Sequence, residues 1–184
     1  MKWLRLVLFL SVGVLILSGC ANEVPSEEVK TLVNQLVEDY QLYFHQSIDL
    51  NDYSVGVYES TDLAEEDTQV NYKGDRVGLV LDREPKENDV NRIVGEYIEG
   101  QLIGIRFDIN TKDSEYHEQS LEQLAVSFLS EHQLADTVSL LDSSKDGNDV
   151  IYRFEDLNQR IIKVYVNEDI RQVVGFLLND GADL

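Results

Sequence analysis

Cysteine is almost absent from this chain of 184 residues, since Cys20 is the only one. A single thiol cannot form a disulfide within the chain, which excludes the small secreted folds that depend on disulfides. Tryptophan and methionine also occur once each, as Trp3 and Met1 near the N-terminus. The core must therefore be built from Val, Ile, Leu, Tyr and Phe, and the β-branched residues and tyrosines favour sheet.

Basic side chains are scarce: 15 Lys and Arg stand against 35 Asp and Glu, a formal charge of −20. Nucleic-acid binding requires many Lys and Arg to neutralise phosphates, and adsorption to anionic lipid requires the same charges. The composition therefore argues against both functions. The excess of acid fits either a well-hydrated surface or a surface that attracts cations or a basic partner.

Long hydrophobic runs are rare, and the longest spans about 12 residues, from Leu6 to Leu17. That length is typical of the core of a signal peptide and is short of the roughly 20 residues that cross a bilayer. Lys2 and Arg5 precede the run, and four residues follow that end in the cysteine: Leu17, Ser18, Gly19 and Cys20. An ordinary secretory signal and a short membrane anchor are the alternatives to consider.

These four residues, behind a basic segment and an apolar core, resemble the lipobox of bacterial lipoproteins. The resemblance implies that residues 1–19 are a cleaved lipoprotein signal peptide and that the Cys20 thiol carries a diacylglyceryl group. Residues 20–25 would then be a tether at the extracytoplasmic face of the cell membrane. Two acyl chains suffice for stable anchoring. The mature chain keeps all 35 acidic but only 13 basic side chains, a formal charge of −22.

Two segments have the apolar spacing of amphipathic helices. The first is predicted over residues 27–45, with Ser26 as a possible cap and two acids in its first turn. The second follows Ser120 and Gln123, whose spacing matches a capping box, and is expected to end near His132-Gln133.

Most of the remaining chain alternates apolar and polar residues, as β-strands do. After the first helix, strands are expected over residues 53–58, 69–72, 77–81, 92–97 and 102–109, the last two forming a hairpin around Glu99-Gly100. After the second helix, strands are expected over residues 137–141, 150–154, 162–166 and 170–178. The polar segments 62–67, 82–89 and 142–149 are predicted to be solvated loops or turns.

The predicted fold class is therefore α+β, with two helix-plus-antiparallel-sheet units over residues 26–110 and 111–184. An amphipathic helix and a one-faced sheet each need a partner, and each unit can bury both by laying its helix across its own sheet. A duplication is suggested by element order alone, because no residue-level repeat is visible.

The second unit resembles the PepSY domains of exported bacterial proteins. The resemblance lies in the capped helix, in Val150–Phe154 and in Ile161–Val166. It implies a small non-catalytic module that contacts or restrains another exported protein, often an enzyme. A cystatin-like helix on a curved sheet has the same element order.

Motifs for catalysis are missing from the sequence. His45, His117 and His132 have no second ligand at metal-binding spacing, and no Gly-x-Ser-x-Gly elbow or phosphate-binding loop occurs. The acidic cluster Glu65, Glu66 and Asp67 is predicted to lie in a solvated loop, which keeps all three carboxyls ionised. The sequence thus predicts a protein that is not an enzyme and has no cofactor.

Calcium is the one metal for which a pattern exists. Asp142, Ser144 and Asp146 place oxygens at alternate positions before Gly147. The pattern then departs from the EF-hand, because the twelfth position is Arg153 rather than Glu. A plain hairpin turn favours the same residue types, so both interpretations stay open.

Three aromatic residues crowd the end of the first helix: Tyr40, Tyr43 and Phe44. They fit either core packing or a patch that faces a partner, since interfaces are enriched in aromatics. The leading hypothesis is a lipid-anchored, non-enzymatic module that binds or modulates another envelope protein. The alternatives are a lipoprotein that binds a small molecule or Ca²⁺, and an envelope enzyme that uses acidic residues.

Overall fold

The structure, a computed structural model, describes residues 27–58, 76–110 and 119–179. This part has two α-helices and eight strands in a single antiparallel sheet, which confirms the α+β class. The first helix-and-strand group comprises α1 (Glu27–Phe44), the 3-10 turn η1 (Leu50–Asp52), β1 (Ser54–Tyr58), β2 (Arg76–Asp82), β3 (Val90–Ile98) and β4 (Gln101–Ile109). The second comprises α3 (Leu121–Glu131), β5 (Val138–Asp146), β6 (Asp149–Asp156), β7 (Ile161–Asn167) and β8 (Gln172–Asn179).

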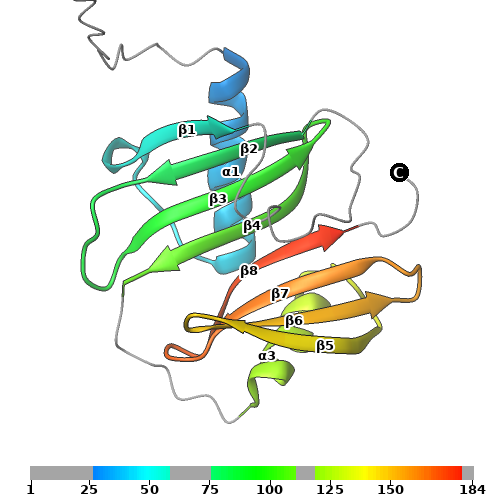
Figure 1. The fold of residues 1–184 in the computed structure, drawn as a ribbon. Coiled ribbons are helices and arrows are strands. Elements are labelled where there is room, and N and C mark those ends of the chain that lie inside the picture. Colours follow the sequence, from blue (N-terminus) through cyan, green and yellow to red (C-terminus); the bar gives the residue numbers. More distant parts are fainter. Residues whose placement is uncertain (1–26, 59–75, 111–118, 180–184) are drawn as a thin grey trace, which may run out of the picture.

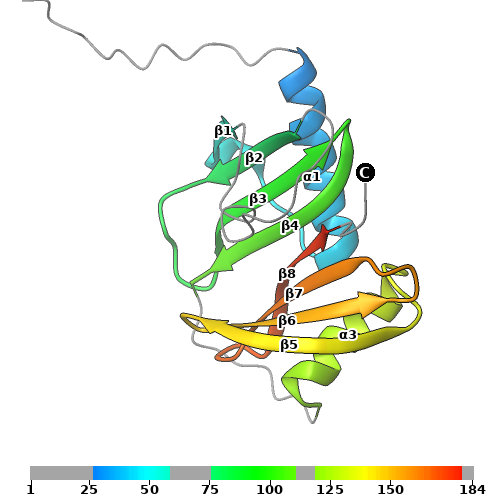
Figure 2. The same cartoon turned by 45° about the vertical axis from the view of Figure 1, so that its right-hand side comes forward.

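The strand order is β1-β2-β3-β4-β8-β7-β6-β5, so each half is a helix followed by a four-stranded meander. The halves join through antiparallel pairing of β4 with β8, in which Gly104 opposes Leu177, Ile105 opposes Phe176 and Arg106 opposes Gly175. Both helices lie on the same face of the sheet, α1 over the first four strands and α3 over the last four (Figures 1 and 2). The sequence indicates two helix-plus-sheet units but does not show that their sheets merge.

Helix α1 buries the stripe that its apolar spacing predicts, through Val33, Leu36 and Tyr40. Leu36 packs closely on β3, because a Cβ atom at Gly95 would come within 2.4 Å of its Cδ1 atom. The helix ends one residue earlier than predicted. His45 has a φ of +55°, which turns the chain out of the helix while its N–H still donates to the carbonyl of Gln41.

Helix α3 begins with the predicted capping box. The Ser120 hydroxyl accepts a hydrogen bond from the N–H of Gln123 at 3.1 Å, and the Gln123 side chain accepts one from the N–H of Ser120 at 2.9 Å. The helix ends at Glu131, close to the predicted position. Gln133 then has a φ of +56°, and the N–H of Leu134 donates to the carbonyl of Leu129, as in a Schellman motif.

The strands confirm the predicted hairpin of β3 and β4 and correct one link. Residues 142–146 belong to β5, which pairs with β6 as far as a tight turn at Gly147, so the predicted polar loop over 142–149 is wrong. The alternation there is hidden by polar side chains on both faces of an edge strand.

Four predicted segments lie outside the described residues: the signal peptide (residues 1–19), the tether (20–25), the acidic segment 62–67 and the strand 69–72. Neither described helix combines the length and apolar character required to span a bilayer.

Candidate functional site

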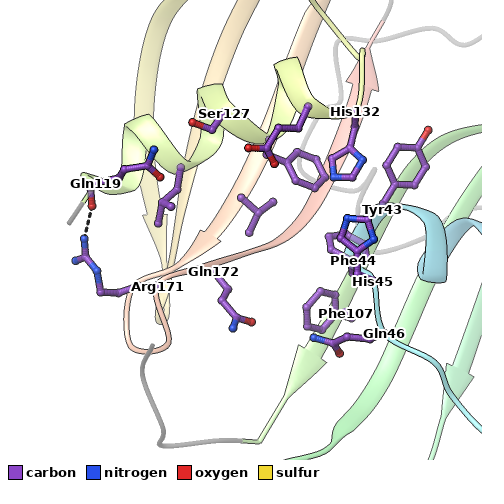
Figure 3. A pocket seen from close by; sticks show the side chains of 14 residues that line it. Tyr43, Phe44, His45, Gln46, Phe107, Gln119, Ser127, His132, Arg171 and Gln172 are labelled. Carbon is purple, nitrogen blue, oxygen red and sulfur yellow. Dashed lines mark hydrogen bonds between the residues drawn. The ribbon is translucent and has the colours of Figure 1, made fainter. Parts of the chain in front are cut away.

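The structure forms an open groove of about 380 Å³ where the C-terminal end of α1 meets α3 (Figure 3). Four parts of the chain line it: the end of α1 with the two residues after it (43–46), one face of α3 with Gln119 before it, Phe107 of β4, and Arg171 with the first two residues of β8. The groove therefore draws on both halves of the molecule, and it exists because β4 and β8 join the two meanders edge to edge.

Aromatic rings form the base of the groove and connect the halves. From α1, Phe44 lies 4.9 Å from Phe107 and 5.8 Å from Phe128 of α3, between ring centroids. Tyr43 lies 4.8 Å from Phe176 of β8, and Phe176 lies 5.8 Å from Phe128. Edge-to-face and offset pairs at these separations add stability beyond that of burial alone. The rings therefore hold the two helices at a fixed spacing.

The three aromatic residues at the end of α1 have different positions. Tyr40 is fully buried, its ring packs edge-on against Phe107 at 5.4 Å, and its hydroxyl donates to Gln46 Oε1 at 2.7 Å. Burial raises the pKa of Tyr40 far above its ordinary value of 10.0. Tyr43 and Phe44 are only partly buried and line the groove. Tyr40 thus packs in the core, and the other two are the ones accessible from the groove.

Two histidines that are far apart in the sequence meet at one end of the groove. The ring centroids of His45 and His132 are 5.8 Å apart, and His132 also packs on Phe128 and Tyr43. Burial lowers the pKa of His132 below 6.5, the charge of His45 lowers it further, and Glu131 acts in the opposite direction. Sequence spacing could not show this pair, because each histidine lies beyond the end of a different helix. His117 lies outside the described residues.

Arg171 lies at the opposite end of the groove, beside the start of α3. Its Nη2 group donates to the backbone carbonyl of Gln119 at 2.6 Å (Figure 3). Arg171 has a φ of +54°, a left-handed conformation that is unusual for a residue other than glycine. Arg171 was not predicted as a site residue, because the sequence places it inside the expected strand 170–178, whereas the structure has it in the turn before β8.

Polar side chains complete the rim. The groove residues include three glutamines (Gln46, Gln119 and Gln172), Ser127 and Glu131. Each glutamine amide offers both donors and an acceptor, which is the complement of a peptide group. The arrangement can therefore hold an apolar group against the rings while its polar parts form hydrogen bonds at the rim.

The residues of the calcium hypothesis lie elsewhere, on edge strand β5. Alternate residues of a strand are about 7 Å apart, so Asp142, Ser144 and Asp146 do not form the wrapping loop that this hypothesis requires. Asp142 instead accepts a hydrogen bond from Arg153 at 2.8 Å, and Lys145 pairs with Glu168. Within the described residues, no group of three or more His, Cys, Asp or Glu side chains could hold a metal ion.

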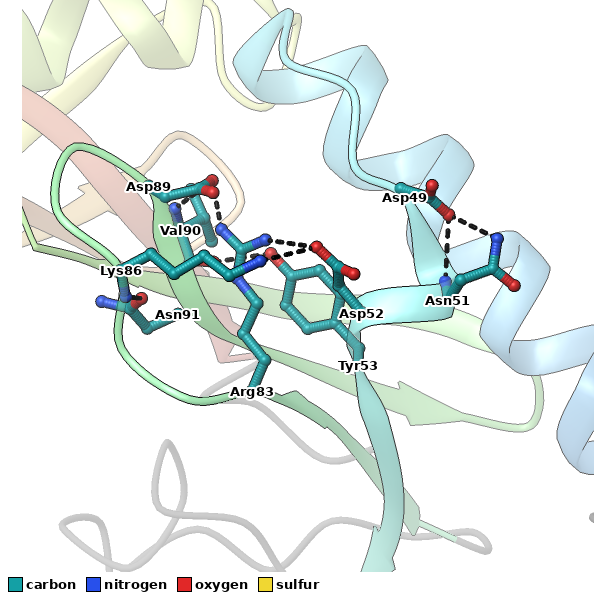
Figure 4. Close-up of polar contacts among 9 residues, drawn as sticks. All are labelled: Asp49, Asn51, Asp52, Tyr53, Arg83, Lys86, Asp89, Val90 and Asn91. Atoms are coloured by element: carbon teal, nitrogen blue, oxygen red, sulfur yellow. Dashed lines mark hydrogen bonds and ion pairs between the residues drawn. The ribbon is translucent and has the colours of Figure 1, made fainter.

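A second polar cluster, around Arg83, stabilises the first half (Figure 4). The segment after β2 was predicted to be solvated, but the Arg83 side chain is only 7% exposed and stacks 4.8 Å from the centroid of the Tyr53 ring. It pairs with Asp52 and Asp89. A hydrogen bond from Lys86 holds the pKa of Asp52 below its ordinary value. Because these charges partner one another, the cluster serves to attach the turn before β1 to the end of β2.

The predicted lipidation site falls outside the described residues, namely Leu17, Ser18, Gly19 and Cys20. Comparisons with known proteins find no matching family model and no matching curated protein. Among solved structures, the chain is similar to the Bacillus megaterium YpeB C-terminal domain, at 14% sequence identity and a TM-score of 0.47. The similarity covers 88% of this chain and 68% of that chain.

Proposed function

We propose that this chain is a lipid-anchored, extracytoplasmic, non-enzymatic module that binds another protein of the cell envelope in the groove between α1 and α3. The observation that carries the proposal is the composition of the groove. It has partly exposed rings of Tyr43 and Phe44 at its base and an arginine, glutamines and a glutamate at its rim. Aromatic residues and arginine surrounded by a polar rim are the features that distinguish protein interfaces from the rest of a surface.

The anchor rests on the N-terminal pattern. A basic start, an apolar run of about 12 residues and the sequence Leu17 to Cys20 match a lipoprotein signal. A diacylglyceryl group on Cys20 would hold the mature domain at the membrane surface, where its groove meets other envelope proteins. The resemblance of the second half to PepSY domains, through Val150–Phe154 and Ile161–Val166, supports the same kind of function.

Photo-crosslinking in intact cells tests the binding proposal. A benzoylphenylalanine residue is introduced in place of Ser127 in the groove, and in a control in place of Ser139 on the exposed edge strand β5. The proposal expects one specific envelope protein attached at position 127 and not at position 139. Equal adducts at both positions, or none at 127, would contradict it.

Labelling with palmitate tests the anchor separately. The label should appear on the wild-type protein and be lost in Cys20→Ser.

Binding of a small molecule is the second candidate. A groove of about 380 Å³ falls within the usual range for small-ligand sites. A lipoprotein of this kind would be stabilised by its free ligand, so a rise in melting temperature with a compound from a metabolite set would favour this candidate. The wild-type protein and a Phe44→Ala variant would be compared, since a ligand held in the groove should lose its effect in the variant.

A further inference from the structure

The groove is elongated and differs in charge at its two ends. One face of α3 lines the groove through Leu124, Ser127, Phe128 and Glu131, and Arg171 contacts Gln119, just before the N-cap of that helix. A helix of 11 residues is about 16 Å long, which equals the length of about five residues of extended peptide. The cation Arg171 and the anion Glu131 are therefore separated by most of the length of α3.

The end at Arg171 favours a negative charge. Its guanidinium group is partly exposed at the groove, and its Nη2 group is held there by the carbonyl of Gln119. The N-terminus of α3 adds the positive end of a helix dipole. The opposite end holds Glu131 and the C-termini of α1 and α3, whose dipoles are negative. This difference in charge is a local feature of the groove, whereas the chain as a whole carries an excess of 20 acidic charges.

We propose that the groove binds an extended segment of about five residues from another exported protein, with an aromatic side chain on the partly exposed ring of Phe44 and an acidic side chain at Arg171. This inference rests on the proposed function and specifies the partner segment. Charge complementarity at Arg171 selects the acid, and the partly exposed ring of Phe44 selects the aromatic group. The glutamines along the rim match the donors and acceptors of a peptide backbone, which favours a peptide over a compact metabolite.

The test uses defined peptides and the mature protein purified in detergent. Two fluorescein-labelled, amidated pentapeptides, Asp-Gly-Phe-Gly-Gly and Gly-Gly-Phe-Gly-Asp, cover both chain directions. Their counterparts carry Asn for Asp or Ala for Phe. Fluorescence anisotropy should show that one Asp peptide binds about tenfold more tightly than its Asn counterpart, the usual effect of a hydrogen bond to a charged group. The Ala counterpart should also bind at least about tenfold more weakly.

Arg171→Gln keeps a Cβ atom at the same φ, so it removes the charge without changing the backbone preference. In this variant the ratio between Asp and Asn peptides should fall to about one. Arg153→Gln is the matched control, because Arg153 pairs with Asp142 outside the groove, and it should leave the ratio unchanged. Melting temperatures of both variants verify that they are folded.

An unchanged ratio in Arg171→Gln, or no binding of either Asp peptide, would overturn the inference. Displacement of the peptide by N-acetylphenylalanine and N-acetylaspartate at equal concentrations would also overturn it, because the site would then recognise small molecules. Failure of the proposed function gives a different result, namely the absence of a specific crosslink from position 127 in cells. A crosslink there combined with no peptide selectivity would retain the partner and reject the segment proposed here.

Discussion

The guanidinium group of Arg106 on β4 lies 4.9 Å from the ring centroid of Tyr165 on β7, although strand β8 runs between these two strands. Gly175 of β8 pairs with both residues, and its lack of a side chain leaves the space that Arg106 crosses. Asp149 pairs with Arg106 at 2.9 Å. This contact therefore strengthens a junction in which only three residue pairs of the described sheet join the two halves.

We expect Gly175→Ala to weaken this junction. A Cβ atom there would lie 2.7 Å from the carbonyl oxygen of Ile105 and 2.9 Å from the Cα atom of Arg106, both on the backbone of β4. Forced overpacking of this kind costs about 2–3 kcal/mol of unfolding free energy, measured by urea denaturation. Gly147→Ala is the control, because it meets no atom within 4 Å and should lose only about 1 kcal/mol through its φ of +57°. Equal losses in the two variants would contradict this account.

Local patterns predicted the elements well, because each depends on neighbouring residues. The capping box of Ser120 and Gln123 and the hairpin turn at Glu99-Gly100 both follow from short-range hydrogen bonds and backbone preferences. Strand β5 was predicted too short because an edge strand has no buried face to impose alternation.

The groove could be predicted only in part. Tyr43 and Phe44 were identified from their clustering, with core packing as the alternative. His132, Arg171 and Phe107 reach the same groove through the pairing of β4 with β8, a contact between residues about 70 apart in sequence. Long-range pairing of this kind leaves no periodic signal in the sequence. The burial of Arg83 was missed for the same reason, since its partners Asp52 and Tyr53 lie in an earlier segment.

The end of α3 offers a stabilising substitution. Gln133 has an exposed side chain and a φ of +56° at the position where helices favour glycine. Gln133→Gly should raise the unfolding free energy by about 0.5–1 kcal/mol, since relief of the left-handed strain exceeds the extra chain entropy that glycine loses on folding. Gln133→Ala keeps the strain and should bring no gain. Thermal unfolding of both variants measures the difference, and a gain of the same size in Gln133→Ala would exclude this explanation.

The turn between β6 and β7 depends on a single carboxylate. The side chain of Asp156 accepts hydrogen bonds from the N–H groups of Asn158 and Arg160, and from Arg160 Nε at 2.7 Å. Burial acts to raise the pKa of Asp156, but these hydrogen bonds outweigh it and hold the pKa below 3.8. Asp156→Asn should therefore cost about 2 kcal/mol of unfolding free energy at neutral pH.

The pH dependence of Asp156 has a defined sign. With a folded-state pKa below that of the unfolded chain, its contribution is complete above pH 3.8 and is lost as the pH falls through the folded-state pKa. The difference in stability between wild type and Asp156→Asn should therefore shrink in urea titrations below pH 3.8. Asp136→Asn, which removes a carboxylate at an exposed position, is the control. A constant difference at all pH values would show that Asp156 does not act through its charge.

His132 makes the contact between the helices sensitive to mild acid. Because burial and the nearby His45 lower the pKa of His132 in the folded state, the unfolded chain takes up a proton at a higher pH than the folded one. The stability that neutral His132 provides is complete above pH 6.5 and declines as the pH falls from 6.5 through the folded-state pKa. The unfolding free energy should therefore fall more between pH 7.5 and pH 5.5 in the wild type than in His132→Gln.

In His45→Gln, NMR titration of the His132 imidazole should show its pKa rising only part of the way to 6.5, since burial is the larger cause and remains. A wild-type pKa of 6.5 or above for His132 would show that the two rings are not packed together as the structure has them.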